Sequence, residues 1–347
     1  VVCADDLTPS ETAALERRNI AALVTAHGSA ISHTAILAHS MNIPTVIGIG
    51  DEFLANIRPG EQALVDGFSG EVILEPDAGV LSKLTAPQEK STDTSEGTHT
   101  ADGTHVSIYS VDDPCAPLPE YADGIAVFGC PLLSDETKQY EYYRAIAERT
   151  PDCRAIIRMP VISPKDPDRQ IKYDQQIRAV FRAASHGEPG ILFPMITSVP
   201  EARKILAACD DAKMKLRAEG VKCSENVKIG FMVEIPAAAI ISDCLAPMAD
   251  FFIIDSDSIA RHTLACYEED CFSPDFADGQ LEAVMRLIGN SARNAVKNGA
   301  RIGICGSLAG DTSLTGDFLR MGIDNFCVTP DRLAEVRKRV TEVDLEV

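Results

Sequence analysis

The sequence contains no tryptophan, and aromatic residues make up only 5% of its 347 positions. A tryptophan-based stacking platform is therefore excluded. Basic residues are also scarce: 32 Lys and Arg stand against 52 Asp and Glu, which gives a formal net charge of −20 at pH 7. A surface this acidic repels nucleic acid and anionic lipid, so both are set aside as partners. An anionic small substrate would need its own local cluster of Arg or Lys.

Long apolar runs and paired cysteines are missing as well. No apolar run approaches the ~18 residues of a membrane span, and no signal peptide is recognisable. The eleven cysteines form no CxxC pair and their number is odd. These features predict reduced thiols, a cytoplasmic location and no membrane insertion. The first residues, VVCA, already resemble a strand, so we expect that the chain starts within a longer protein.

The length and the pattern of the chain predict two domains. Residues 1–80 alternate short strand-like runs with helical stretches and are expected to form a small β/α domain, incomplete at its N-terminus. Residues 81–104 are expected to be a linker, because from residue 85 onward they hold almost no large apolar side chain.

Residues 105–347 show a different rhythm, in which apolar runs alternate with helical patterns. Eight runs are strand candidates: VSIYS, GIAVFG, AIIRM, GILFPMI, IGFMVEI, FFIID, RIGICG and NFCVTP. Eight strand-and-helix units over ~240 residues predict an α/β fold of the closed (β/α)₈ TIM barrel type. Active sites of such barrels lie at the C-terminal ends of the strands. The residues at those ends are Ser110, Gly129, Arg158, Pro194, Glu234, Asp255, Cys305 and Thr329.

Three of the seven histidines, His27, His33 and His39, stand within thirteen residues. The run ISHTAILAHSMNIP predicts a helix that starts near Ser32 and places His33 in its first turn. Free backbone N–H groups and the helix dipole favour an anion there, so the imidazole is suited to carry a phosphoryl group. A purely structural role for a histidine at a helix start stays open. A metal site formed by the three histidines is disfavoured, because positions six apart on a helix do not converge.

Several segments together resemble one family. HGSAISHTAILAHSMNIPTVIG closely resembles the phosphohistidine swivelling domain shared by phosphoenolpyruvate-utilising enzymes. The flanking CADDLTPSETA and four later segments resemble, in the same order, the Enzyme I family of the bacterial sugar phosphotransferase system. These later segments are FPMITSVPEAR, GFMVEIPAAA, DFFIIDSDS and GICGSLAGD.

The resemblance implies a function and its partners. Phosphoenolpyruvate would bind with Mg²⁺ at the mouth of a phosphoenolpyruvate/pyruvate-type barrel and donate its phosphoryl group to a histidine. That histidine would pass the group on to a histidine phosphocarrier protein. A homodimer formed through the barrel is also implied, and the upstream helical domain that docks the carrier would be absent.

The resemblance also implies roles for single residues. His33 matches the phosphorylated histidine, and Cys305 matches the group that protonates the enolate carbon. Arg158 matches one phosphate-binding arginine, and Glu234 matches a metal-binding glutamate, as a highly charged substrate and a hard cation require. From the residues alone, Glu234 could equally form a salt bridge at the barrel mouth and Cys305 could be a buried small hydrophobe.

Other positions depart from the family pattern. Gly129 and Cys130 stand where Arg-Thr-Glu is usual, so one phosphate-binding arginine is lost. Asp257 and Ser258 stand where Asn-Asp is usual, so the second metal carboxylate is expected to be displaced, with Asp257 as the candidate ligand, or lost. Glu268 stands near the position of another substrate arginine and reverses its charge.

Two cations are candidate replacements in the substrate clamp, namely Lys165 and Arg169 in PVISPKDPDRQIKYD. A clamp short of about three cations loses well over the ~1.5–3 kcal/mol of one charged hydrogen bond. Two alternatives to an active phosphotransferase therefore stay open. One is a degenerate pseudoenzyme whose barrel is a dimerisation or metabolite-sensing scaffold. The other, weaker one is a fragment similar to pyruvate phosphate dikinase.

Overall fold

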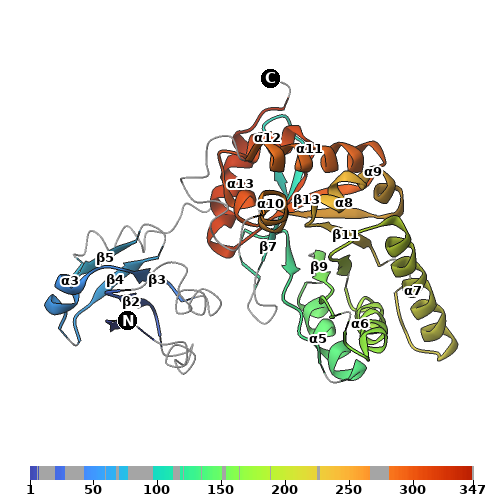
Figure 1. The fold of residues 1–347 in the computed structure, drawn as a ribbon, viewed down its shortest axis with the longest axis horizontal. Helices are drawn as coiled ribbons and strands as arrows, with labels where there is room; N and C mark the ends of the chain where they lie inside the picture. Colours follow the sequence, from blue (N-terminus) through green and yellow to red (C-terminus); the bar gives the residue numbers. More distant parts are fainter. Residues whose placement is uncertain are drawn as a thin grey trace. The chain divides into compact units, whose positions relative to one another are not determined.

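The computed structural model describes residues 1–5, 7, 20–27, 43–58, 60–67, 70–76, 97–111, 118–119, 121–133, 135–150, 154–163, 165–187, 189–224, 227–265 and 281–345. The chain divides into two compact units, Val1–Thr92 and Asp93–Val347, which are coloured along the sequence in Figure 1. The helix expected in ISHTAILAHSMNIP falls on residues that, up to residue 42, lie outside the described part of the chain.

The smaller unit contains a parallel sheet with the strand order β1-β2-β3. The strands are β1 (Val2–Ala4), β2 (Leu23–Thr25) and β3 (Thr45–Ile47), and helix α3 (Asp51–Asn56) follows them. An antiparallel hairpin joins β4 (Ala63–Asp66) to β5 (Glu71–Leu74). Short strands are thus present in residues 1–80, as the sequence predicted. The central strand β2 is buried at every position, because it has a neighbour on each side.

The larger unit is a closed barrel of eight parallel strands. They are β7 (His105–Ser110), β8 (Gly124–Val127), β9 (Arg154–Arg158), β10 (Pro189–Phe193), β11 (Ile229–Val233), β12 (Phe251–Asp255), β13 (Arg301–Cys305) and β14 (Asn325–Val328). Each strand pairs with the next, and β14 pairs with β7 to close the ring. The predicted (β/α)₈ fold and its eight strand candidates are confirmed.

The helices surround the ring of strands, from green α5 to red α13 in Figure 1. They are α5 (Glu136–Arg149), α6 (Arg169–Ala183), α7 (Val199–Ala218), α8 (Pro236–Ile240), α9 (Ser242–Leu245), α10 (Ser256–Leu264), α11 (Leu281–Lys297), α12 (Thr315–Arg320) and α13 (Leu333–Glu342). Short 3₁₀ turns are η2 (Ala246–Met248), η5 (Ser307–Gly310) and η6 (Pro330–Arg332). The side chains of Asp135 and Ser198 cap α5 and α7 by accepting backbone N–H groups. Among the described helices, none combines the length and the apolar character that a membrane span requires.

Alternation along the strands divides the barrel core into two layers. One set of side chains fills the interior of the ring: Tyr109, Ala126, Ile156, Leu192, Met232, Ile253, Cys305 and Cys327. The neighbouring positions, such as Ile108, Ile157 and Phe252, pack outward against the helices. This two-residue period therefore decides that Cys305 faces the inside of the barrel.

The C-terminal end of the predicted linker, residues 97–104, differs from the expectation. Strand β6 (Thr98–His99) forms an antiparallel hairpin with β7, and Thr98 and Thr100 are buried. The turn between the strands uses Gly103 at φ +90°, and the backbone N–H of Thr100 donates to the carbonyl of Thr104 at 3.0 Å. Backbone pairing orders this segment although it lacks large apolar side chains.

Candidate functional site at the mouth of the barrel

Arg158 and Glu234 form an ion pair at the C-terminal ends of β9 and β11. The guanidinium Nη2 lies 3.1 Å from Glu234 Oε2, and the glutamate side chain is only 2% exposed. The other carboxylate oxygen, Oε1, accepts the backbone N–H of Met195 at 2.7 Å. Nε of Arg158 points to the sulfur of Met232, 3.0 Å away. Both oxygens of the buried carboxylate therefore have partners, as a buried charge requires.

A second group of polar contacts surrounds Asp255, which is the last residue of β12 and directly precedes α10. Its Oδ1 accepts the backbone N–H groups of Asp257 and Ser258, each at 3.1 Å, so it is the N-cap of α10. Its Oδ2 accepts the hydroxyl of Ser258 at 2.7 Å, and the same hydroxyl oxygen accepts Nη2 of Arg261 at 3.1 Å. The carboxylate of Asp255 is thus hydrogen-bonded to Ser258, and position 258 is where the family pattern has its aspartate.

Asp257 is held by the loop that follows β13. Its Oδ1 accepts the backbone N–H of Ser307 at 2.8 Å and the hydroxyl of Ser256 at 3.3 Å. Burial raises the pKa of this carboxyl above its ordinary value; the hydrogen bonds from Ser307 oppose the shift and the charge of Asp255 adds to it. The charge of Asp255 therefore disfavours the ionised form of Asp257 unless a cation lies between them.

Gly306 makes the close approach of this loop possible. Its φ of 91° and ψ of −171° belong to a region that only glycine adopts readily. A Cβ built there would lie 2.4 Å from Oγ of Ser256 and 2.9 Å from Cγ of Asp257. The position therefore needs glycine both for its backbone conformation and for space.

Gly306→Ala is expected to lower the free energy of unfolding of the barrel by about 2–5 kcal/mol, from backbone strain and a steric clash together. Gly220→Ala is the matched control: φ there is +70°, but a built Cβ meets nothing within 4 Å. The control should lose only the backbone contribution of about 1–2 kcal/mol. Urea denaturation followed by circular dichroism measures both changes, and equal losses would contradict the clash.

Cys305 lies beside these carboxylates at the end of β13, where it pairs with Asp255 in the strand register. Burial raises the pKa of its thiol well above the ordinary value, and the charges of Asp255, Asp257 and Glu234 raise it further. The thiol is therefore protonated at physiological pH. Cys130, in contrast, packs toward the helix layer, where burial raises its pKa to about 12.

The other predicted substrate groups are not joined to this cluster. Lys165 is exposed on the loop after β9, and the Arg169 guanidinium lies over the ring of Tyr173, 5.5 Å from its centre. Among the described contacts, no hydrogen bond or ion pair links either cation to Glu234. Gly129 is exposed just beyond the end of β8, and a Cβ built on it meets nothing within 4 Å. His33 and Glu268 lie outside the described residues.

The donor chemistry of the mouth fits Mg²⁺. Glu234, Asp255 and Asp257 offer carboxylate oxygens, which this cation prefers. Over the described part of the barrel, no three such ligand atoms all lie within 4.8 Å of one another. A complete protein cage is not needed, because Mg²⁺ usually takes one or two carboxylates and completes its shell with water and substrate phosphate.

The fold and the mouth define a (β/α)₈ barrel protein in which guanidinium groups, carboxylates and a protonated thiol meet at the C-terminal ends of the strands. Residues 166–345 match the family described as PEP-utilising enzyme, PEP-binding domain, and residues 1–70 match PEP-utilising enzyme, mobile domain. The chain belongs to the family of phosphoenolpyruvate-utilising enzymes.

Within this family, the chain is similar to proteins named phosphoenolpyruvate-protein phosphotransferase. It is 30% identical over 385 residues to that of Priestia megaterium and 29% identical over 384 residues to that of Haloferax volcanii. Both comparisons cover 99% of this chain and 67% of the relative. The resemblance to Enzyme I is confirmed. Among solved structures, a citrate lyase of Burkholderia xenovorans LB400 compares with this chain at a TM-score of 0.48 and 14% sequence identity. The comparison covers 71% of this chain and 79% of that one.

Sequence reasoning missed two residues of the mouth. Asp255 was recognised as a strand end but not as the carboxylate next to Ser258, and Arg261 was not considered. A signal was available for Arg261, because it follows Ser258 by three positions and thus lies on the same face of α10. No comparable pattern marks Asp255, whose partners are set by the start of the helix.

Proposed function

We propose that the protein is a phosphoenolpyruvate-protein phosphotransferase that accepts the phosphoryl group on His33 and passes it to a histidine phosphocarrier protein. The observation that carries the proposal is the meeting of Arg158, Glu234, Asp257 and Cys305 at the mouth of the barrel. These groups come from the ends of four strands, β9, β11, β12 and β13, and they supply the cation, the hard oxygen ligands and the proton source that cleavage of phosphoenolpyruvate needs.

Each group of the mouth has a proposed task. Arg158, oriented by Glu234, binds the substrate phosphate, and Arg261 is a second guanidinium on the same side of α10 as Ser258. Lys165, on the loop after β9, and Arg169, at the start of α6, are proposed as further cations that bind the substrate. Glu234, Asp257 and Asp255 are the proposed ligands of Mg²⁺, which when bound neutralises phosphate charge and polarises the enolate oxygen.

The proposed transfer breaks the bond between phosphorus and the enol oxygen and forms one between phosphorus and a ring nitrogen of His33. The electron pair left on the enol oxygen gives the enolate of pyruvate. The protonated thiol of Cys305 then donates its proton to the enolate carbon, which yields pyruvate, and the thiolate recovers a proton from water. The raised pKa of Cys305 supports this role, because it keeps the proton on sulfur until the enolate forms.

The remaining proposals follow from family membership. They are a homodimer formed through the barrel, a cytoplasmic location and a phosphocarrier protein as the acceptor. The acidic balance of the chain, 52 acidic against 32 basic residues, favours an acceptor with a basic docking face.

Incubation of the protein with phosphoenolpyruvate and Mg²⁺ is the direct test. We expect intact-protein mass spectrometry to detect one added phosphoryl group per chain, which is lost on brief acid treatment, with release of one pyruvate. A parallel incubation with EDTA in place of Mg²⁺ should give no label. If no acid-labile group and no pyruvate form in the presence of Mg²⁺, the proposal is wrong and the scaffold alternative replaces it.

A further inference from the structure

The smaller unit carries a separate group of side chains at one edge of its parallel sheet. Asp5 directly follows β1, His27 follows β2, and Asp51 is the first residue of α3 after β3. The backbone N–H of His27 donates to the carbonyl of Asp5 at 2.9 Å, and that of Gly50 donates to Ala26 at 3.1 Å. Because the C-terminal ends of adjacent parallel strands meet at one edge, three residues far apart in the sequence are held together there.

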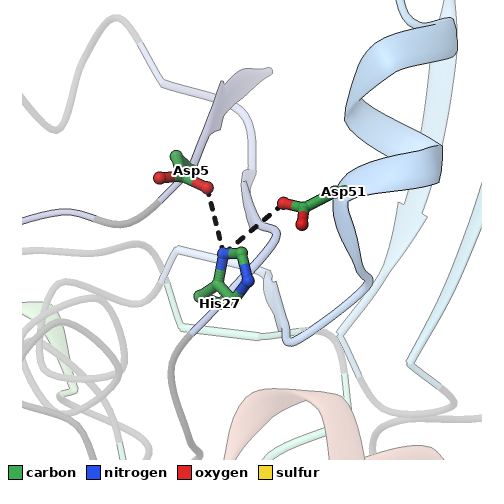
Figure 2. A group of neighbouring side chains, drawn as sticks. All are labelled: Asp5, His27 and Asp51. Atoms are coloured by element: carbon green, nitrogen blue, oxygen red, sulfur yellow. Dashed lines mark hydrogen bonds and ion pairs between the residues drawn. The ribbon is translucent and has the colours of Figure 1, made fainter.

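The side chains of the three residues converge. Nδ1 of His27 lies 3.0 Å from Oδ1 of Asp5 and 3.6 Å from Oδ1 of Asp51. Figure 2 shows both carboxylates pointing toward this same ring nitrogen. One ligand atom from each of the three residues lies within 4.8 Å of the other two. Two carboxylates and one imidazole nitrogen therefore face a common point.

We propose that Asp5, His27 and Asp51 bind one divalent transition-metal cation of the Zn²⁺ type. Ligand atoms about 2.1 Å from a tetrahedral centre lie about 3.4 Å apart, and the two measured separations from Nδ1 lie on either side of that value. An imidazole nitrogen combined with carboxylates favours Zn²⁺ over Mg²⁺ or Ca²⁺, which take oxygen ligands almost exclusively. Three protein ligands leave a coordination position for water.

A proton on His27 is the competing explanation for the cluster. A proton on Nδ1 satisfies Asp5 at 3.0 Å, but Asp51 at 3.6 Å is beyond hydrogen-bond distance. Asp51 would then keep only an ion pair with the protonated ring, whose single positive charge cannot balance the charges of two carboxylates. A divalent cation offsets both negative charges and uses all three ligands, so the geometry points to a metal. The site differs from a trio of histidines, because its other members are aspartates from neighbouring strand ends.

Equilibrium dialysis of the metal-depleted protein against Zn²⁺, followed by elemental analysis, measures the bound equivalents. The parent should bind one equivalent more than His27→Gln and one more than Asp51→Asn. The side chains of Asp5, His27 and Asp51 are 79%, 58% and 75% exposed, so these substitutions should leave the fold intact, which circular dichroism checks. The measurement uses no phosphoenolpyruvate, so its outcome is independent of the proposed phosphoryl transfer.

His99→Gln is the matched control, because His99 is another exposed histidine and it lies in the larger unit, beside the ring of His105. This variant should keep the equivalent that His27→Gln loses. Zinc bound by exposed thiols such as Cys3 and Cys244 is common to all variants and cancels in the difference. Equal binding by the parent and His27→Gln would overturn the proposal. Loss in His27→Gln with full retention in both Asp5→Asn and Asp51→Asn would also overturn it, because the carboxylates would then not be ligands.

Discussion

Replacing His33 with alanine is expected to remove all acid-labile phosphate that the protein acquires from phosphoenolpyruvate. The imidazole nitrogen is the proposed nucleophile, and alanine offers no group to which phosphorus could be bound. The prediction rests on the sequence, which places His33 at a helix start within HGSAISHTAIL. Mass spectrometry of the variant after incubation with phosphoenolpyruvate and Mg²⁺ measures the label.

His39→Ala is the matched control for this experiment. His39 is six positions further along the same predicted helix, on roughly the opposite face, so its loss should leave the label in place. If His33→Ala keeps its acid-labile label while His39→Ala or His27→Ala loses it, the phosphorylated residue has been assigned wrongly. The circular dichroism spectrum of each variant should match that of the parent.

Gly129→Arg is expected to tighten the binding of phosphoenolpyruvate roughly 10- to 150-fold, since a charged hydrogen bond contributes about 1.5–3 kcal/mol. Gly129 lies just beyond β8, and in the register of the barrel Val127 of β8 pairs with Ile157, the neighbour of Arg158. Because β8 and β9 are neighbouring strands, an arginine at 129 would extend from the strand end next to that of Arg158 and add a further cation to the mouth. The backbone at this exposed position has space for a side chain to begin, because a built Cβ meets nothing within 4 Å.

Gly129→Gln separates charge from bulk in this experiment. Glutamine adds a polar side chain without the positive charge, so it should change the affinity little. Calorimetric titration with phosphoenolpyruvate and Mg²⁺ on the parent and both variants gives the dissociation constants. Tight binding by the parent that Gly129→Arg leaves unchanged would show that other cations, such as Arg261 or Lys165, already complete the clamp.

Much of the fold could be predicted because its signals are local. The eight apolar runs between His105 and Val347 correspond to the eight strands, and the polar caps Asp135 and Ser198 mark helix starts. The prediction was weaker at residues 97–104, where the order comes from backbone hydrogen bonds to β7. Such bonds leave no pattern of apolar residues, so the segment resembled a linker.

The candidate site was predictable only where a motif carried it. Glu234, Asp257 and Cys305 stand in segments that resemble the family in order, and Arg158 in AIIRM was matched to a phosphate-binding arginine. The structure places all four at one end of the barrel. Lys165 and Arg169 were chosen for their charge alone, and no described contact joins them to Glu234. A charge on an exposed loop does not specify its partner, because many positions of a long side chain are similar in energy.

By itself, the sequence determined the family, the order of the two units and the strands of the barrel, since periodicity and motifs are properties of neighbouring residues. Only the tertiary structure decided that the hydroxyl of Ser258 bonds to both Asp255 and Arg261. It also decided that the loop at Gly306 brings the backbone N–H of Ser307 to Asp257. It also decided that Asp5, His27 and Asp51 meet. The physical reason is the same in each case. Parallel strands bring their C-terminal ends to one edge, and the contacts made there depend on strand order and register, which no single stretch of sequence contains.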